Sequence, residues 1–438
     1  MQEPDKADPE GGRPGNARPD HPGAQGAADE GPLGLVVPEP EARPGDKPDF
    51  SHVEIPPAGS VRRPPVDTDP RDIRDLAFTI IRVLNRDGQA VGPWAEALQP
   101  DPDMLSEGLR HMMTLRAYDA RMLTAQRQQK TSFYIQHLGE EAISCAFQRA
   151  LRPGDMNFPT YRQAGLLIAS GYPVELMMNQ IYSNAGDPLK GRQLPVCYAA
   201  RDHGFFSVSG NLATQYIQAV GWAMASAIAG DRRIAAAWIG DGSTAESDFH
   251  AALVFASTYK APVVLNIVNN QWAISTFQGI ARGGSGTFAA RGLGFGIPAL
   301  RVDGNDYLAV LAAAEWAAQR ARRNLGPTLV EYVTYRAGGH STSDDPAAYR
   351  PAEESAAWPL GDPVLRLKNH LIATGHWSED RHIQAEAQIR AEIVALQKQA
   401  EAIGTLHSGA RPDPAGMFAD VYAEMPAHLA KQQQQSGL

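Results

Sequence analysis

Two short apolar runs near the middle of the chain give the clearest structural signal in its hydrophobic pattern. They cover residues 234–239 and 263–268, and nearly every position in both is apolar. Such runs are typical of central strands in a parallel sheet, which are buried on both faces. Between them, apolar residues recur at helical spacing from Phe249 to Ala256. The pattern therefore predicts a strand–helix–strand unit.

The same alternation recurs further along the chain and predicts a second unit of this kind. Alternating strands and helices favour an α/β fold, here a parallel sheet flanked by helices, with helical additions at both ends. The further elements expected, in chain order, are helices at about 103–129 and 140–151, a small-residue helix ending near 229, a strand at 299–302, a helix at about 307–323 and a strand at 328–333.

Composition divides the chain into three parts. The first 48 residues are crowded with Pro, Gly, Asp, Glu and Ala and contain no aromatic residue, so they cannot bury enough apolar surface to offset chain entropy. We expect residues 1–70 to form a disordered Pro/Gly-rich arm and residues 71–360 to form the α/β domain with its N-terminal helices. Residues 361–438 should be a helical C-terminal region. Its amphipathic helix, with apolar positions from Ile383 to Leu396, would pack on the domain or on a partner subunit.

Charge and cysteine content exclude several classes of protein. The net charge of −9 and the isoelectric point near 5.8 argue against a nucleic acid as partner. No apolar stretch approaches the roughly 18 residues needed to cross a bilayer, so no membrane association is expected. Cys145 and Cys197 are isolated and form no metal-binding or disulfide pattern. These features predict a cytoplasmic protein.

The end of the first apolar run carries residues suited to binding phosphate. Gly240-Asp241-Gly242 follows the run directly, and Ser243 with Glu246 forms a capping-box pattern that would start the helix just after the glycines. Glycines let the backbone approach a ligand closely, and free N–H groups at a helix start attract phosphate. We therefore predict that Gly240, Gly242 and Ser243 contact a phosphate group.

An acidic residue in a phosphate loop indicates a metal ion. Asp241 stands in the loop after the first strand, and Asn269-Asn270 ends the second strand. Magnesium prefers hard oxygen ligands such as carboxylate and amide carbonyl groups, and it commonly bridges protein to phosphates. We assign Asp241 and Asn270 as magnesium ligands, with Asn270 also at the cofactor.

The glycine loop also fits a second interpretation. Residues 240–245 match the loose dinucleotide pattern G-x-G-x-x-A, which occurs in nicotinamide and flavin enzymes. Against this, Asp241 would repel a bare pyrophosphate, and the second strand ends in two amides where a ribose-binding acid is expected. A nicotinamide-dependent oxidoreductase stays the more distant alternative, together with a non-catalytic subunit.

The glycine loop and the asparagine pair resemble the thiamin-diphosphate motif of 2-oxoacid decarboxylases and dehydrogenases. The resemblance runs from about residue 131 to 350 and is nearest to the α subunits of branched-chain 2-oxoacid dehydrogenases. The segments that carry it are Ser-Phe-Tyr at 132–134, Gly-Glu-Glu at 139–141, Tyr-Arg at 161–162, Lys-Gly-Arg-Gln at 190–193, Asn-Leu-Ala-Thr-Gln at 211–215, Val-Asp-Gly-Asn-Asp at 302–306, His-Ser-Thr-Ser-Asp-Asp at 340–345 and Tyr-Arg at 349–350.

The resemblance implies a thiamin-diphosphate-binding fold and a set of site residues. The main-chain oxygen of Trp272 would complete the magnesium ligands. His340, with Arg336 beside it, would act on the substrate's carboxylate and oxygen and would also contact the cofactor. The remaining cofactor contacts implied are Tyr161, Arg162, Gly210 and the backbone of Leu212.

An oxygen-rich cluster precedes the small-residue helix. In similar family segments such a cluster holds a structural monovalent cation, which implies a K⁺ site in this chain. The alternative is that Ser209 and Thr214 cap the helix. The residues concerned are Ser209, Asn211, Thr214 and Gln215.

Only the diphosphate and metal half of a thiamin site is recognisable in the chain. The resemblance therefore implies a separate β subunit supplying a glutamate, in an α₂β₂ assembly, and a lipoyl-bearing acyltransferase core. The implied reaction is oxidative decarboxylation of branched-chain 2-oxoacids, such as 3-methyl-2-oxobutanoate, with reductive acyl transfer to the lipoyl group. Pyruvate and acetoin are alternative substrates. Some relatives are phosphorylated at the position of Ser341, where a purely structural serine is the alternative.

Overall fold

The computed structural model describes residues 34–438. The chain separates into two units, Met1–Val37 and Pro38–Leu438, and every regular element described belongs to the second. Residues 1–33 of the predicted disordered arm lie outside the described residues. Within residues 34–438, no helix combines the length and the apolar character that crossing a bilayer requires.

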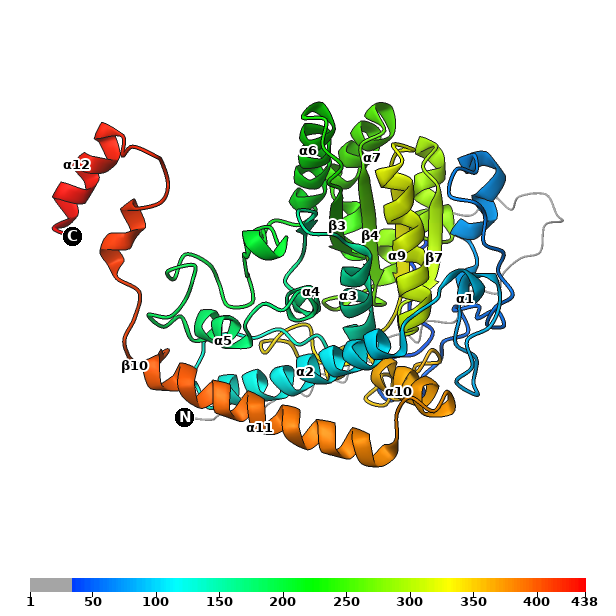
Figure 1. The fold of residues 1–438 in the computed structure, drawn as a ribbon, viewed down its shortest axis with the longest axis horizontal. Helices are drawn as coiled ribbons and strands as arrows, with labels where there is room; N and C mark the ends of the chain where they lie inside the picture. The colour runs from blue at the N-terminus through cyan, green and yellow to red at the C-terminus, as the bar shows by residue number, and fades with distance from the viewer. Residues whose placement is uncertain (1–33) are drawn as a thin grey trace, which may run out of the picture. The chain divides into compact units, whose positions relative to one another are not determined.

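A six-stranded sheet, with every neighbouring pair parallel, forms the centre of the second unit (Figure 1). This confirms the predicted α/β fold. Both predicted strand–helix–strand units are present, and their helices are α7 (Ser247–Tyr259) and α9 (Tyr307–Arg322). The strands, in their order across the sheet, are β1 (Ile80–Ile81), β7 (Ala299–Asp303), β8 (Thr328–Val333), β4 (Val263–Asn269), β3 (Ala235–Gly240) and β2 (Met156–Phe158).

Helices cover both faces of the sheet, because alternate residues of a strand point to opposite sides. Along β3, Ala235, Ala237 and Ile239 belong to the core that packs under α6 (Thr214–Ile228) and α7. Ala236 and Trp238 belong to the core on the other face, with α3 (Glu141–Phe147) and α9. The uninterrupted apolar runs in the sequence are explained by this two-sided burial.

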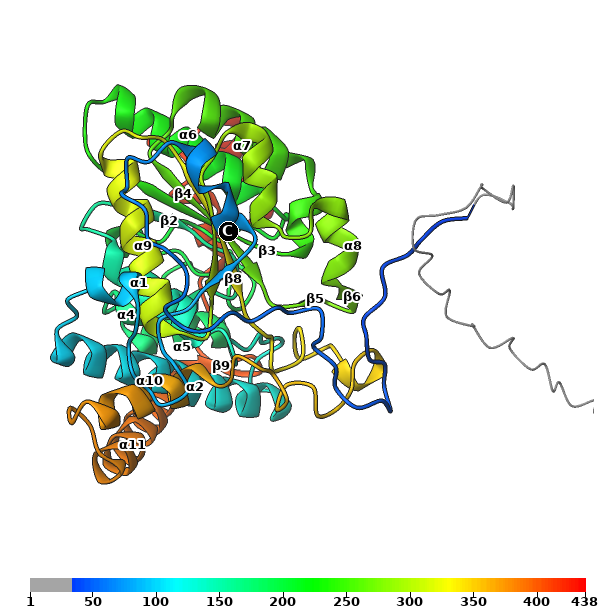
Figure 2. The same cartoon turned by 90° about the vertical axis from the view of Figure 1, so that its right-hand side faces the viewer.

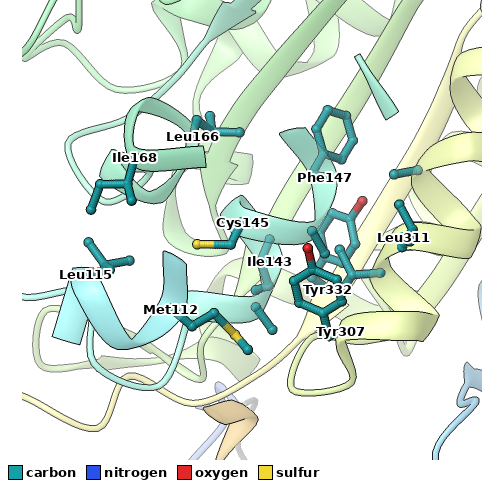
Figure 3. Packing of buried hydrophobic residues seen from close by; sticks show 14 of the residues in the cluster. Met112, Leu115, Ile143, Cys145, Phe147, Leu166, Ile168, Tyr307, Leu311 and Tyr332 are labelled. Carbon is teal, nitrogen blue, oxygen red and sulfur yellow. The ribbon is translucent and has the colours of Figure 1, made fainter. Parts of the chain in front are cut away.

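Helix α3 is at the centre of the core on that second face. Figure 3 shows Ile143 of α3 between Met112 of α2 (Pro102–Arg127) and Leu311 of α9, with Tyr332 of β8 nearby. These four side chains are at most 1% exposed.

The helix predicted at 140–151 is shorter in the structure, because α3 ends at Phe147 and a 3-10 turn follows.

Below the sheet, the C-terminal helix α11 (Glu379–Ile403) lies beside α2, with α10 (Pro363–Ala373) near both (Figures 1 and 2). Ile389 and Ile393 are 2% exposed, whereas Ile383 is 63% exposed and lies outside the buried stripe. The other short elements are α1 (Pro93–Ala97), α4 (Ala164–Ala169), α5 (Val174–Tyr182), β5 (Trp272–Ala273), β6 (Thr276–Phe277), α8 (Gln278–Arg282), β9 (Gly404–Thr405), β10 (Ser408–Gly409) and α12 (Ala427–Ser436).

Residues 38–70 differ from the expected disordered arm, because they pack against the domain as an irregular strap. Side-chain donors of the core bind its backbone: Trp94 donates to Arg62 O at 3.1 Å and Trp316 donates to Pro64 O at 2.9 Å. Val53 of the strap is 8% exposed. The sequence of the strap has no helical or strand period, and distant side chains supply hydrogen bonds to its backbone.

Candidate active site

A cavity of about 620 Å³ lies at the carboxyl ends of β2, β3, β4 and β8. Ligands of parallel α/β sheets bind at this edge. The register that pairs Gly240 with Val268 brings Asp241 beside the residues that follow β4. Most of the predicted site residues line the cavity, namely Tyr161, Arg162, Ser209, Gly210, Asn211, Leu212, Gln215, Gly240, Asp241, Gly242, Ser243, Asn270, Trp272 and His340.

Asp241 is the most strongly perturbed acid of the cavity. Its side chain is 2% exposed, and its Oδ2 atom has no hydrogen-bond partner among residues 34–438. Burial raises the pKa of Asp241 to about 7, since removal from water disfavours the carboxylate. Asn270, which is 7% exposed, lines the same cavity. An unsatisfied carboxylate oxygen next to an amide suits a magnesium ion, so these residues fit the predicted group.

The predicted capping box is wrong. A 3-10 turn, Gly242–Ala245, follows Asp241, and α7 begins only at Ser247. Glu246 occupies the N-cap position without a side-chain bond, and its own N–H donates to Ser243 O at 3.2 Å. The cavity therefore faces the backbone of a tight turn rather than the first turn of α7.

The two glycines of the loop have different physical roles. A side chain at Gly240 would meet no atom of the described residues within 4 Å, so this position has open space beside it. A Cβ at Gly242 would lie 2.4 Å from the Ala273 Cβ. Gly242 is therefore required because β5 packs closely on the turn, in addition to lining the cavity.

Arg336 does not line the cavity, which differs from the role predicted for it. Its side chain is 1% exposed, and it donates to Trp272 O at 2.8 Å and to Ile274 O at 3.0 Å. Gln271 and Ile274 have φ values of +76° and +55°, which are unfavourable for residues other than glycine. Such a backbone persists only when surrounding contacts stabilise it, and the hydrogen bonds from Arg336 are contacts of this kind. Arg336 thus fixes the loop after Asn270. The carbonyl of Trp272 has a second lone pair, which stays available for the predicted metal contact.

The rings of His340 and Tyr161 contact each other in the wall of the cavity. Their rings form an edge-on contact with centroids 5.8 Å apart. Arg162 donates from Nη2 to His340 O at 2.9 Å and from Nη1 to Gln136 O. The Arg162 guanidinium therefore secures the His340 loop. Burial, and after it the charges of Arg162 and Arg336, lower the pKa of His340 to about 4, so its imidazole is neutral at pH 7.

The first prediction concerns the protonation of His340. In the chain without ligand we expect its imidazole to titrate near pH 4. Binding of a diphosphate should raise this pKa, because nearby negative charge favours the imidazolium form. Since the unfolded histidine has the higher pKa, the unfolded state binds more protons between about pH 4 and 6.5, and His340 destabilises the fold as the pH falls through that window. NMR of isotope-labelled histidine would measure both values.

The control for this titration is His340→Gln, which identifies the His340 signal by its disappearance. A midpoint near 6.5 without ligand, or no change on adding diphosphate, would contradict the prediction.

The predicted cation cluster is only partly assembled. Thr214 does not line the cavity, and its hydroxyl donates to Asn211 O at 3.0 Å. Ser209 Oγ accepts from Asn211 N at 3.1 Å, as in a turn. Gln215 donates to Trp238 O at 2.8 Å, while its buried Oε1 has no partner in the part of the chain that the structure describes. The Gln215 oxygen is the group here that a cation would satisfy.

Glu140 is the main cavity residue for which no role was predicted. It is 3% exposed and accepts from Asn270 Nδ2 at 2.7 Å. The sequence signal was the Gly-Glu-Glu segment at 139–141, but the pattern does not distinguish its two acids. Glu141 instead pairs with Arg116 at 2.8 Å. The other lining residues without a predicted role are Thr160, Gln163, Ala245, Val268, Ala273, Ile274, Thr276, Ile280 and Ala281.

Comparison with known families agrees with this geometry. Residues 109–408, more than half of the chain, match the family described as the dehydrogenase E1 component. The chain belongs to the dehydrogenase E1 component family. Members of this family depend on thiamin diphosphate, which favours the thiamin interpretation of residues 240–245 over the nicotinamide one. A second match, to the N-terminal segment of the 2-oxoisovalerate dehydrogenase E1 α subunit, covers residues 31–71 of this E1 chain and includes the strap.

Individual relatives of this E1 chain share its full length or most of it. It is 62% identical to the 2-oxoisovalerate dehydrogenase α subunit of Pseudomonas aeruginosa over 94% of the chain and 100% of that relative. It is 40% identical to the mitochondrial α subunit of Mus musculus over 81% of the chain and 79% of the relative. With the Arabidopsis thaliana α subunit 2 it shares 37% identity over 80% of the chain and 73% of the relative. An α subunit of an E1 component implies a β subunit as partner.

Proposed function

We propose that this chain is the α subunit of a branched-chain 2-oxoacid dehydrogenase E1 component. With its β subunit it would decarboxylate 3-methyl-2-oxobutanoate and related 2-oxoacids and transfer the acyl group to the lipoyl group of an acyltransferase core. The observation that carries the proposal is the buried Oδ2 of Asp241, which lies beside Asn270 and has no hydrogen-bond partner within the described part of the chain. The chain is also 62% identical to a 2-oxoisovalerate dehydrogenase α subunit. The α₂β₂ assembly, the acyltransferase core and a cytoplasmic location belong to this proposal.

The proposal gives a role to each of the predicted site residues. Asp241, Asn270 and the carbonyl of Trp272 would bind Mg²⁺, and His340 would meet the 2-oxoacid. Thiamin diphosphate, when bound, supplies the electron sink for loss of carbon dioxide, and the protein orients and shields the reaction. Arg336 would act by holding the loop. The groups that would contact the diphosphate are Tyr161, Arg162, Gly210, Leu212, Gly240, Gly242 and Ser243. Those that would hold K⁺ are Ser209, Asn211, Thr214 and Gln215.

The exposed surface of α6 and α7 is suited to contact with a partner subunit. Gly221 and Ala225 of α6 are exposed and four residues apart, which allows close approach of another chain. Large apolar side chains are also exposed on both helices. Exposed apolar residues of this kind mark interfaces between proteins when they gather on one face. The exposed large side chains on the two helices are Ile217, Ile228, Val254, Phe255 and Tyr259.

The second prediction tests the acyl-chain preference. When the chain is co-purified with its β subunit, kcat/KM for 3-methyl-2-oxobutanoate should exceed that for pyruvate by about 10-fold or more. Each extra methyl group that a pocket accommodates changes the transition-state free energy by about 1–3 kcal/mol. Steady-state decarboxylation assays with both substrates, and with the straight-chain 2-oxobutanoate as the matched control, would measure the ratio. Preference for pyruvate would contradict the branched-chain assignment.

A further inference from the structure

Glu140 is a buried acid that its own helix does not use. It stands at the N-cap of α3, but its side chain makes no capping bond there. Instead the carboxylate extends into the wall of the cavity, where it is 3% exposed. Burying an acid is costly unless it is paired and hydrogen-bonded. Two groups supply this: Asn270 Nδ2 at 2.7 Å and Arg162 Nε at 3.6 Å.

The contact with Asn270 determines the orientation of that amide. An ionised carboxylate only accepts hydrogen bonds, so the NH₂ group of Asn270 must face Glu140. The Oδ1 atom then points to the opposite side, where the only hydrogen bond described for it is a long one from Trp272 N at 3.4 Å. Without Glu140 the amide could turn, and an NH₂ group offered to a cation would repel it.

We propose that Glu140 is a positioning residue for the metal site, because its carboxylate fixes the Asn270 amide so that Oδ1 is offered to the divalent cation. This inference rests on the proposed function, which places Mg²⁺ at Asp241 and Asn270. Partners that orient a metal ligand typically change metal affinity by about 10–100-fold when they are replaced. Arg162 contributes by balancing the charge of Glu140 beside Asp241.

The neighbouring Glu141 offers a matched control. It is also fully buried, at 0% exposed, but it does not line the cavity. Its carboxylate pairs with Arg116 at 2.8 Å and accepts from Gly139 N at 2.9 Å. Glu141→Gln therefore makes the same chemical change one residue away and perturbs the fold without touching Asn270.

The experiment titrates Mg²⁺ by calorimetry into the co-purified α and β subunits in the presence of thiamin diphosphate. Glu140→Gln should weaken Mg²⁺ binding about 10–100-fold, because a glutamine amide both donates and accepts and no longer dictates the orientation of Asn270. Glu141→Gln should change the Mg²⁺ affinity by less than about 3-fold and should lower Tm instead.

A second background separates orientation from structure. Asp has two equivalent oxygens, so in an Asn270→Asp protein the side chain offers an oxygen to the metal whichever way it turns. There the Glu140 carboxylate lies against a second carboxylate and repels it, whereas a glutamine can donate a hydrogen bond to it. Adding Glu140→Gln should therefore strengthen Mg²⁺ binding rather than weaken it. A structural role for Glu140 would give the same loss in both backgrounds.

The outcomes are distinguishable. Unchanged Mg²⁺ affinity in Glu140→Gln, an equal loss in Glu141→Gln, or the same sign in both backgrounds would overturn the positioning role while the proposed function stands. Absence of Mg²⁺-dependent cofactor binding in the wild-type complex would overturn both.

Discussion

Replacement of Asp241 by asparagine should abolish Mg²⁺-dependent binding of thiamin diphosphate and raise the thermal stability of the chain without ligands. The carboxylate is the one negatively charged ligand proposed for the cation. Without a cation it is buried with an unsatisfied oxygen, and its pKa is raised to about 7. A neutral amide removes the cost of burying that charge, so loss of function and gain of stability arise from the same atom.

The stability difference has a defined dependence on pH. The folded state holds the Asp241 proton more tightly than the unfolded state, whose carboxyl titrates near 4. Stability from this group is therefore present below about pH 4 and is lost as the pH rises to about 7. The gain in Tm of Asp241→Asn over wild type should grow from pH 5 to pH 8. Calorimetric titration and thermal denaturation of the ligand-free chain at both pH values would measure the two effects.

The matched control is Asp87→Asn, which makes the same change at an exposed position. It should leave cofactor binding intact and should not reproduce the pH-dependent gain in Tm. Cofactor binding retained in Asp241→Asn would contradict the magnesium assignment. A Tm that falls equally at both pH values would contradict the prediction that the buried Asp241 carboxylate destabilises the ligand-free fold.

The isolated chain should decarboxylate 2-oxoacids at least about 10²-fold, and up to about 10⁴-fold, more slowly than the complex with its β subunit. That range is what a positioned acid–base group contributes, and the resemblance places such a glutamate on the partner. Within residues 34–438 the mouth of the cavity is also open, because Leu212, Ile274 and Ile280 are about half exposed there. Carbon dioxide release by the chain alone, by β alone and by the mixture would test the requirement.

Two variants sharpen this second experiment. Phe255→Asp, on the proposed α6/α7 interface, should weaken assembly measured by size-exclusion chromatography, because it places a charge on an apolar contact. Ile383→Asp, on the exposed side of α11, is the matched control and should assemble normally. Full activity of the isolated chain would contradict the need for a partner.

Local pattern predicted the parts of the site that lie at strand ends. Apolar runs identified β3 and β4, and parallel neighbours end at the same edge of a sheet, so Asp241 and Asn270 were expected together. The same argument placed His340 after β8, whereas Tyr161, which follows the unpredicted strand β2, was implied only by the family resemblance. In these cases the period of a strand and its last residue are properties of consecutive residues.

Contacts between distant residues decided the rest. The strap of residues 38–70 is ordered because Trp94 and Trp316 bind its backbone, although its composition alone predicts disorder. The helix after Gly242 starts late, because the chain first forms the 3-10 turn Gly242–Ala245, against which Ala273 packs. Neither partner is visible in the local sequence.

The sequence by itself determined the α/β class, the strand–helix–strand units and the acid–amide pair at the edge of the sheet, because hydrophobic period and strand ends are encoded locally. Only the tertiary structure decided which of two adjacent acids reaches the site and that Arg336 holds the loop rather than facing the cavity. The physical reason is that the partner of a buried charge is set by packing across hundreds of residues. Glu140 meets Asn270 across 130 positions of the chain.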